Sequence, residues 1–100
     1  MKKIYIDTSN NEEIIIGLFI EDKKYILKQK LAQRKAQIVL PLIDSLLKEH
    51  KTTLQEITHI EVNPGPGSFT GVRVGVTVAN ALGFALGIPV NEKESIEPVY

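Results

Sequence analysis

The residues with the greatest potential for chemistry lie in one stretch, NPGPGSFTGVRVG, at positions 63–75. It contains four of the seven glycines of the chain and precedes an apolar run. A glycine-rich loop that leads into a helix can bind phosphate, because its backbone N–H groups and the helix dipole both attract anions. The stretch lacks both the GK[ST] ending and the GxGxxG pattern of known phosphate loops, so no lysine is in place to hold phosphate. A tight structural turn that directs the helix is therefore the favoured interpretation.

Five polar residues, in this stretch or elsewhere in the chain, have side chains that could take part in chemistry. Asp7 and Thr8 end the first strand, where they would either hold magnesium or phosphate or cap an Asx-type turn, which is the favoured role. Arg73 is a cation in the first turn of the predicted second helix, where the dipole disfavours positive charge. We expect a carboxylate, a carbonyl or a partner protein to compensate it, or the side chain to extend into solvent. His50 and His59 have no partner at ligand spacing, and we predict no metal site.

Composition limits the function classes. The 100 residues are 43% hydrophobic and 24% charged, which suits one globular domain and leaves too little chain for two lobes with a cleft between them. The formal net charge is zero, so it does not favour direct binding of nucleic acid or of an acidic membrane. The absence of cysteine excludes disulfides and a cysteine nucleophile. The first residues, MKKIYIDTS, lack the apolar core of a signal peptide, so we expect a cytoplasmic protein.

The periodicity predicts the order βββαβαβ, an α/β mixed sheet with helices. Strands are expected at 3–7, 14–20, 24–31 and 57–63, with a short final strand at 88–90. The first three should form an antiparallel meander, and the continuous apolar run at 14–20 predicts a strand covered on both faces. Residues 91–97 show no apolar period and are expected to be a charged tail.

Two helices are expected, at 33–50 and 72–86. Pro41 interrupts the first, and because the apolar stripe spans both sides of it we prefer a kinked helix to a shorter one that begins at the proline. In the second helix, small residues recur every four positions and form a ridge that lets another helix or strand approach closely: Gly71, Gly75, Ala79, Gly83 and Gly87. The two helices are more apolar than one sheet face requires, which predicts a surface that a complex covers.

The second helix is also long enough to raise the question of a membrane span. The apolar run at 72–90 has the necessary length. It contains Arg73, Thr77, Asn80 and Pro89, which argue against insertion. We therefore expect a helix packed in a protein interface.

The sequence GPGSFTGVRVG at 65–75 resembles the signature of the bacterial TsaB family, also called YeaZ, whose members belong to the machinery that makes threonylcarbamoyladenosine (t6A) in tRNA. IDTS at 6–9, LPLIDSLL at 40–47 and LGIPV at 86–90 support the resemblance. It implies an actin/hsp70/sugar-kinase-like (ribonuclease H-like) fold, with a first lobe at 1–91 and a tail at 92–100. The signature loop is then Gly65, Pro66, Gly67, Ser68, Phe69, Thr70, Gly71 and Arg73.

The resemblance also implies a function. Such proteins are not the transferase themselves but pair through two helices with the catalytic subunit TsaD, so this chain would have no catalytic residues and no cofactor. It would form a homodimer when alone, act with a further TsaE-like ATPase and meet tRNA only indirectly. The implied partner interface comprises Ile38, Val39, Leu42, Ile43, Leu46, Val72, Gly75, Val76, Ala79, Leu82, Gly83 and Leu86.

Two departures from the family pattern limit the transfer. A histidine common near the start of the first helix is replaced in RKAQ at 34–37, so its role is not carried over. NEKESIEPVY at 91–100 follows the first lobe directly, and its end resembles the family's terminal segment, so we expect a naturally shortened form. The rival hypothesis is a nucleotide-binding or enzymatic fragment that uses Asp7, Thr8 and the loop at 65–71. A peptidase role finds no nucleophile or metal set in the sequence.

Overall fold

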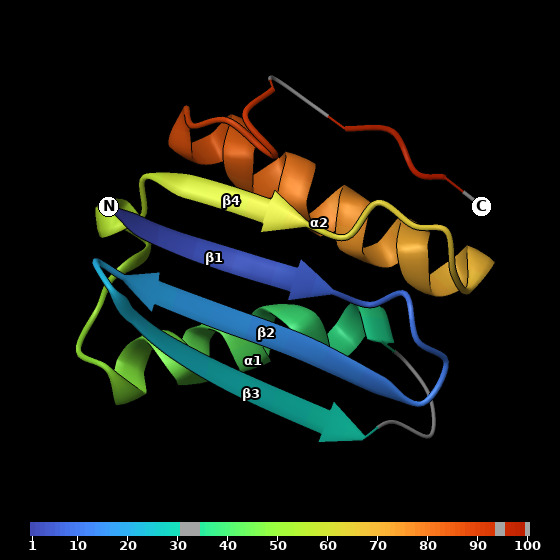
Figure 1. Ribbon diagram of the computed structural model, residues 1–100, viewed down its shortest axis with the longest axis horizontal. Coiled ribbons are helices and arrows are strands. Elements are labelled where there is room, and N and C mark those ends of the chain that lie inside the picture. The colour runs from blue at the N-terminus through green and yellow to red at the C-terminus, as the bar shows by residue number, and fades with distance from the viewer. Residues whose placement is uncertain (31–34, 94–95, 100) are drawn as a thin grey trace.

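The computed structural model describes residues 1–30, 35–93 and 96–99, which form one four-stranded mixed sheet and two long helices (Figure 1). The strand order is β3-β2-β1-β4, with β1 antiparallel to β2 and parallel to β4. The strands are β1 (Lys2–Asp7), β2 (Glu13–Ile20), β3 (Lys23–Lys30) and β4 (His59–Val62). This arrangement confirms the predicted meander and the predicted mixed sheet, in which β4 is the strand parallel to β1.

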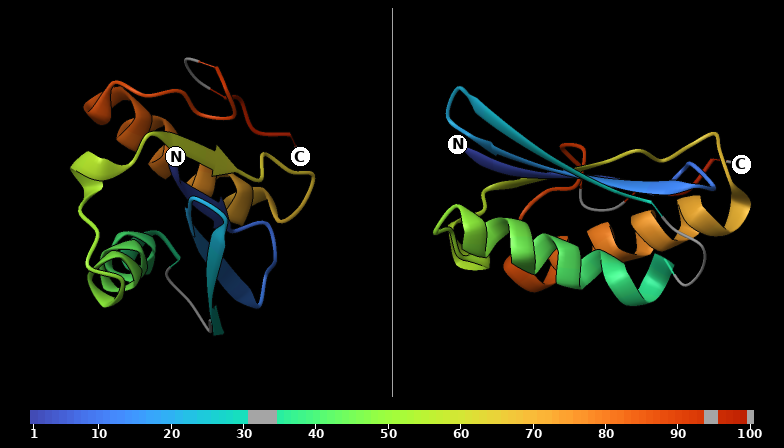
Figure 2. Two further views of the ribbon diagram at one scale, coloured as in Figure 1. Left: turned by 60° about the vertical axis from the view of Figure 1, so that its left-hand side comes forward. Right: turned by 90° about the horizontal axis from the view of Figure 1, so that it is seen from below.

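Both helices lie on the same face of the sheet, as the view from below shows (Figure 2). Ile14, Ile16 and Leu18 of β2 point toward this helical layer and are buried, while Ile15 and Phe19 lie on the opposite face and are partly exposed. The prediction that this strand is covered on both faces is therefore wrong for the part of the chain that the structure describes. The apolar run is continuous because β2 carries aliphatic and aromatic residues on both of its faces.

Helix α1 (Lys35–Glu49) contains Pro41 in its interior. The helix continues on both sides of the proline, so the alternative of a shorter helix that begins there is wrong. Pro41 is tolerated because it lies on the exposed side of the helix, away from Val39 and Ile43 in the core. The predicted start of this helix at 33 and 34 lies outside the described residues. After α1, a 3-10 turn, η1 (Leu54–Glu56), leads into β4.

Helix α2 (Phe69–Leu86) ends at the residue that the sequence predicts. The Ser68 hydroxyl accepts a hydrogen bond from the Gly71 amide at 3.3 Å, and Gly87 takes the left-handed conformation that ends many helices. Thr70 lies inside the first turn. The helix starts three residues earlier than expected, which makes Arg73 its fifth residue.

At the outer edge of β4, the side chain of Asn91 forms hydrogen bonds that a fifth strand would otherwise form. Only Val90 of the predicted final strand pairs with β4, through a single parallel bridge to Ile60. The Asn91 side chain then copies a peptide group: its oxygen accepts from the Val62 amide at 2.8 Å, and its nitrogen donates to the Val62 carbonyl at 3.0 Å. Both backbone groups of Val62 are thus hydrogen-bonded at the place where a fifth strand would continue.

The predicted charged tail is not a free tail. Ile96 packs against the core, and its amide and carbonyl bond to the Asn80 side chain of α2 at 3.0 and 2.8 Å. The Val99 amide donates to the Pro64 carbonyl at 2.6 Å, so residues 96–99 run back over the helix to the glycine-rich loop (Figure 1). The sequence did not reveal this return because Ile96 is a single apolar residue without a period.

Candidate functional site

The glycine-rich loop is held against the end of β1 by the carboxylate of Asp7. Its Oδ1 accepts bonds from the Ser9 amide at 3.0 Å and the Ser9 hydroxyl at 2.6 Å. Its Oδ2 accepts bonds from the Tyr5 hydroxyl and the Asn63 amide group, both at 3.3 Å. A carboxylate has about four acceptor sites, so these four bonds saturate it. The Ser9 bond is the Asx-type turn favoured by the sequence, and no lone pair of Asp7 remains for a metal ion.

The charge state of Asp7 follows from these contacts. Burial alone would raise its pKa, but the hydrogen bonds from Ser9, Asn63 and Tyr5 outweigh burial and lower the pKa below the ordinary value of 3.8. Burial and the nearby negative charge of Asp7 also raise the pKa of Tyr5 to about 12. The pair is therefore an ionised carboxylate beside a neutral phenol at neutral pH, which is the state that the hydrogen bonds require.

Three amides of the loop, those of Gly65, Ser68 and Gly71, are bonded within the chain. Gly65 donates to the Asn63 side chain at 3.0 Å, Ser68 to the Ser9 carbonyl at 2.8 Å, and Val72 to the Ser68 carbonyl at 2.8 Å. Gly65 adopts a φ of 101°, where a side chain would be strained and would meet the Val99 carbonyl. The loop is thus a packed turn, which supports the structural interpretation over the phosphate cradle.

Thr8, which follows Asp7, connects the end of β1 to the start of α2. It is fully buried, and its hydroxyl donates to the Gly71 carbonyl at 2.5 Å. Gly75, one turn further along α2, sits directly against this hydroxyl with no room for a Cβ. Thr8 therefore holds α2 to the sheet and does not face a ligand.

Replacing Asp7 by asparagine tests the hydrogen bonds of the Asp7 carboxylate, because their contribution to stability depends on pH. The pKa of Asp7 is lower in the folded state, so its stabilising effect is present above the unfolded pKa near 3.8 and is lost as pH falls through the folded pKa. We expect Asp7→Asn to lower the free energy of unfolding at pH 7 by about 1–2 kcal/mol, because an amide faces two donors at Oδ2. Urea unfolding from pH 7 to pH 3 should show that the stability difference between the two proteins shrinks on acidification. Glu21 and Glu56 also have lowered pKa values, but both proteins contain them, so their effect cancels in the difference. A difference that does not change with pH would contradict the assigned role.

The ridge of small residues on α2 faces the chain's own sheet. Gly75 lies against Thr8 and Val62, and Gly83 lies against Val90, whose Cγ2 would be 2.6 Å from an added Cβ. The prediction that this ridge is a partner surface is therefore wrong, because β1, β4 and residue 90 already occupy it. Eight residues of the predicted interface are buried in the core: Val39, Ile43, Leu46, Val72, Gly75, Val76, Ala79 and Gly83.

A different stripe of α2 faces outward. Arg73, Thr77, Ala81 and Ala85 recur every four residues and are all exposed. Beside them Thr70, Val74 and Val78 complete a shallow, mainly apolar hollow with Arg73 and Thr77. Phe69 and Phe84 are exposed at the two ends of the helix, Phe84 at 90%. We call this stripe and hollow the outer face of α2.

The remaining four residues of the predicted interface are in partial contact with solvent. Ile38 and Leu42 of α1 and Leu82 and Leu86 of α2 are partly exposed, and Leu40 of α1 is half exposed. Val74 and Val78 were missed in the sequence, although their four-residue spacing beside Leu82 could have indicated a second apolar stripe. The helical layer thus has apolar side chains that lie outside the buried core and remain in contact with solvent.

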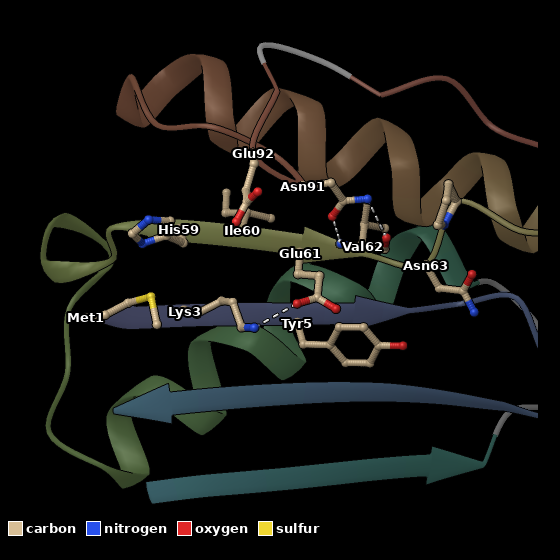
Figure 3. A pocket seen from close by; sticks show the side chains of 11 residues that line it. Met1, Lys3, Tyr5, His59, Ile60, Glu61, Val62, Asn63, Asn91 and Glu92 are labelled. Atoms are coloured by element: carbon tan, nitrogen blue, oxygen red, sulfur yellow. Dashed lines mark hydrogen bonds and ion pairs between the residues drawn. The ribbon is translucent and has the colours of Figure 1, made fainter. Parts of the chain in front are cut away.

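The uncovered face of the sheet offers a second hollow, which Figure 3 shows between β1, β4 and the turn at 91–92. Its charges compensate one another: the Lys3 ammonium bonds to Glu61 at 2.7 Å and also lies 4.7 Å from the centre of the Phe19 ring. Among the described residues, no three metal-ligating side chains cluster anywhere. The hollow gathers neither excess charge of one sign nor a catalytic set.

The chain is similar to known proteins in both sequence and fold. A model of the family described as TsaD, tRNA N6-adenosine threonylcarbamoyltransferase, matches residues 23–97. The chain is 39% identical, over 97% of its length, to the tRNA threonylcarbamoyladenosine biosynthesis protein TsaB of Bacillus subtilis, and 37% identical, over 85%, to that of Haemophilus influenzae. It spans 42% and 36% of these relatives.

Among solved structures, YeaZ from Pseudomonas aeruginosa is similar with a TM-score of 0.84 and 34% identity. The match covers 89% of this chain and 41% of that one. A second structure, of a protein with similarity to peptidase YeaZ from the same organism, gives 0.85. The likeness confirms the predicted fold class, a single lobe of the actin/ribonuclease H-like type.

Proposed function

Because the chain belongs to the family described as TsaD, tRNA N6-adenosine threonylcarbamoyltransferase, and is similar to TsaB, we propose that it is a non-catalytic partner subunit in t6A synthesis. It binds a TsaD-like transferase through its helical layer and supports transfer of the threonylcarbamoyl group to tRNA. The relatives named for t6A biosynthesis support the pathway. The family match supports a TsaD-like partner, and the packed glycine-rich loop supports a subunit without catalytic residues.

One observation carries the partner role: the helical layer keeps an outer apolar face after the core is complete. Val74, Val78 and Leu82 of α2 are partly exposed beside the small residues Ala81 and Ala85. An exposed apolar face is typical of a protein interface. Helix α2 is long and apolar enough by composition to cross a membrane, but its Gly75 side packs on the sheet, as in the core helix of a globular domain.

The rival enzymatic hypothesis has less support. Asp7 is saturated by four hydrogen bonds, and Thr8 is buried beneath α2, so neither side chain faces a nucleotide. One similar structure is described with the word peptidase. The Thr58 hydroxyl lies 2.8 Å from Nδ1 of His59, but this hydroxyl is already bonded to the Lys2 backbone, to its amide at 3.1 Å and to its carbonyl at 3.0 Å. Pairing through the outer face is the function that the geometry favours.

Reconstituted transfer tests the proposal. The purified TsaD-like protein from the same organism, with its other required subunits, is assayed for t6A formation on tRNA with and without this chain. We expect formation to depend on the chain, and the chain alone to form none. Equal rates in both reactions would contradict the proposal. Calorimetric binding of magnesium ATP by the isolated chain, at about micromolar affinity, would favour the nucleotide-binding rival.

A further inference from the structure

Arg73 is the only charged residue of α2, and it stands at one end of the outer face. Its guanidinium lies 5.3 Å from the centre of the Phe69 ring, in a cation–π contact that holds the group over the hollow. In the described part of the chain the ion pairs are made by other residues, and none reaches Arg73. The structure thus holds a cation in place without an anion of its own.

Any partner that covers the outer face removes Arg73 from water. Burying a guanidinium without an opposite charge is strongly unfavourable, and the opposite charge has to come from the partner. The planar guanidinium forms two parallel hydrogen bonds with a carboxylate, which makes a carboxylate the group that best restores the lost hydration.

The rest of the stripe indicates what carries that carboxylate. Thr77, Ala81 and Ala85 follow Arg73 at four-residue spacing, so the stripe extends for about 18 Å along α2 at 1.5 Å per residue, and small side chains occupy about the last 12 Å of it. Small side chains let a second helix approach to an interaxial distance of about 8 Å. The outer face therefore suits a helix of about three turns.

From these observations we propose that the partner seats a helix on the outer face of α2 and places a carboxylate against Arg73. This inference rests on the proposed function, since the partner is the TsaD-like transferase. It adds the chemistry of recognition: a close apolar contact along Thr77, Ala81 and Ala85, and one ion pair that fixes the position of the partner helix along α2.

Titration of the TsaD-like protein with four forms of the chain tests the ion pair: the natural chain, Arg73→Leu, Arg73→Lys and Arg73→Glu. Leucine keeps apolar contact and glutamate reverses the charge. Lysine keeps the charge but lacks the planar guanidinium that forms two parallel hydrogen bonds with a carboxylate. We expect roughly tenfold weaker binding for leucine, an intermediate loss for lysine and about a hundredfold loss for glutamate. Lys28→Leu, on the opposite face of the sheet, is the matched control and should bind like the natural chain.

Salt dependence and charge exchange complete the test. Binding of the natural chain should weaken when sodium chloride rises from about 50 to about 500 mM, and Arg73→Leu should lose this dependence. One acidic residue of the partner, changed to arginine, should restore binding to Arg73→Glu. If Arg73→Leu binds as tightly as the natural chain with the same salt dependence, the inference is overturned while the proposed function stands. If the natural chain does not bind, both are overturned.

Discussion

Gly75→Ala is expected to lower the free energy of unfolding by about 1–3 kcal/mol, although alanine usually stabilises a helix interior by about 1 kcal/mol relative to glycine. The added methyl group meets the Oγ1 atom of Thr8, which is fully buried and bonded to the Gly71 carbonyl. Either α2 moves away from the sheet or Thr8 rotates and loses its hydrogen bond. Urea unfolding followed by circular dichroism measures the loss.

A double-mutant cycle with Thr8→Ala identifies the cause. Thr8→Ala removes the hydroxyl that obstructs the new methyl group. The double mutant should therefore lose less stability than the sum of the losses in the two single mutants. Thr77→Ala, on the exposed side of the same helix, is the matched control and should change stability by less than about 0.5 kcal/mol. Full stability of Gly75→Ala, or strict additivity with Thr8→Ala, would show that the close contact is wrongly placed.

Ala81→Trp is expected to weaken binding of the TsaD-like protein by at least about a hundredfold while the chain stays folded. Ala81 is exposed in the middle of the small-residue stripe, so an indole there holds a partner helix away without disturbing the core. Thermal unfolding monitors the fold, and calorimetry monitors binding. Lys28→Trp places the same side chain on the opposite face of the sheet and should leave binding unchanged.

Ala79 and Gly83, which the family resemblance places in the partner interface, are unsuitable positions for testing that interface. Ala79 is fully buried, and a side chain at Gly83 would meet Val90. Bulky residues there disrupt the fold itself and cannot report on pairing. If Ala81→Trp binds the TsaD-like protein normally, the outer face of α2 is not the interface.

Local chemistry made most of the fold predictable. The periodicity predicted β1 to β4 and the two helices, the proline and glycine pattern placed the loop, and Ser68 and Gly87 mark the start and the C-terminal cap of α2. These features depend on neighbouring residues, and the favoured Asx turn of Asp7 is of the same kind. The sequence therefore carries them directly.

The orientation of α2 could not be predicted in the same way. A ridge of small residues shows that something approaches closely, but not what approaches, and here Thr8 and Val62 of the same chain do so. The loop assembly joins Asp7 to Asn63 across 56 positions, and the return of the tail depends on Asn80 and Ile96. Such contacts exist only once the sheet has brought distant residues together.

Direct titration of the two purified proteins tests most plainly whether this chain is a partner of a TsaD-like transferase. We expect a saturable complex with a dissociation constant of about micromolar or tighter, which Ala81→Trp weakens by at least about a hundredfold and Lys28→Trp leaves intact. Two proteins that elute separately and give no heat of binding would contradict it.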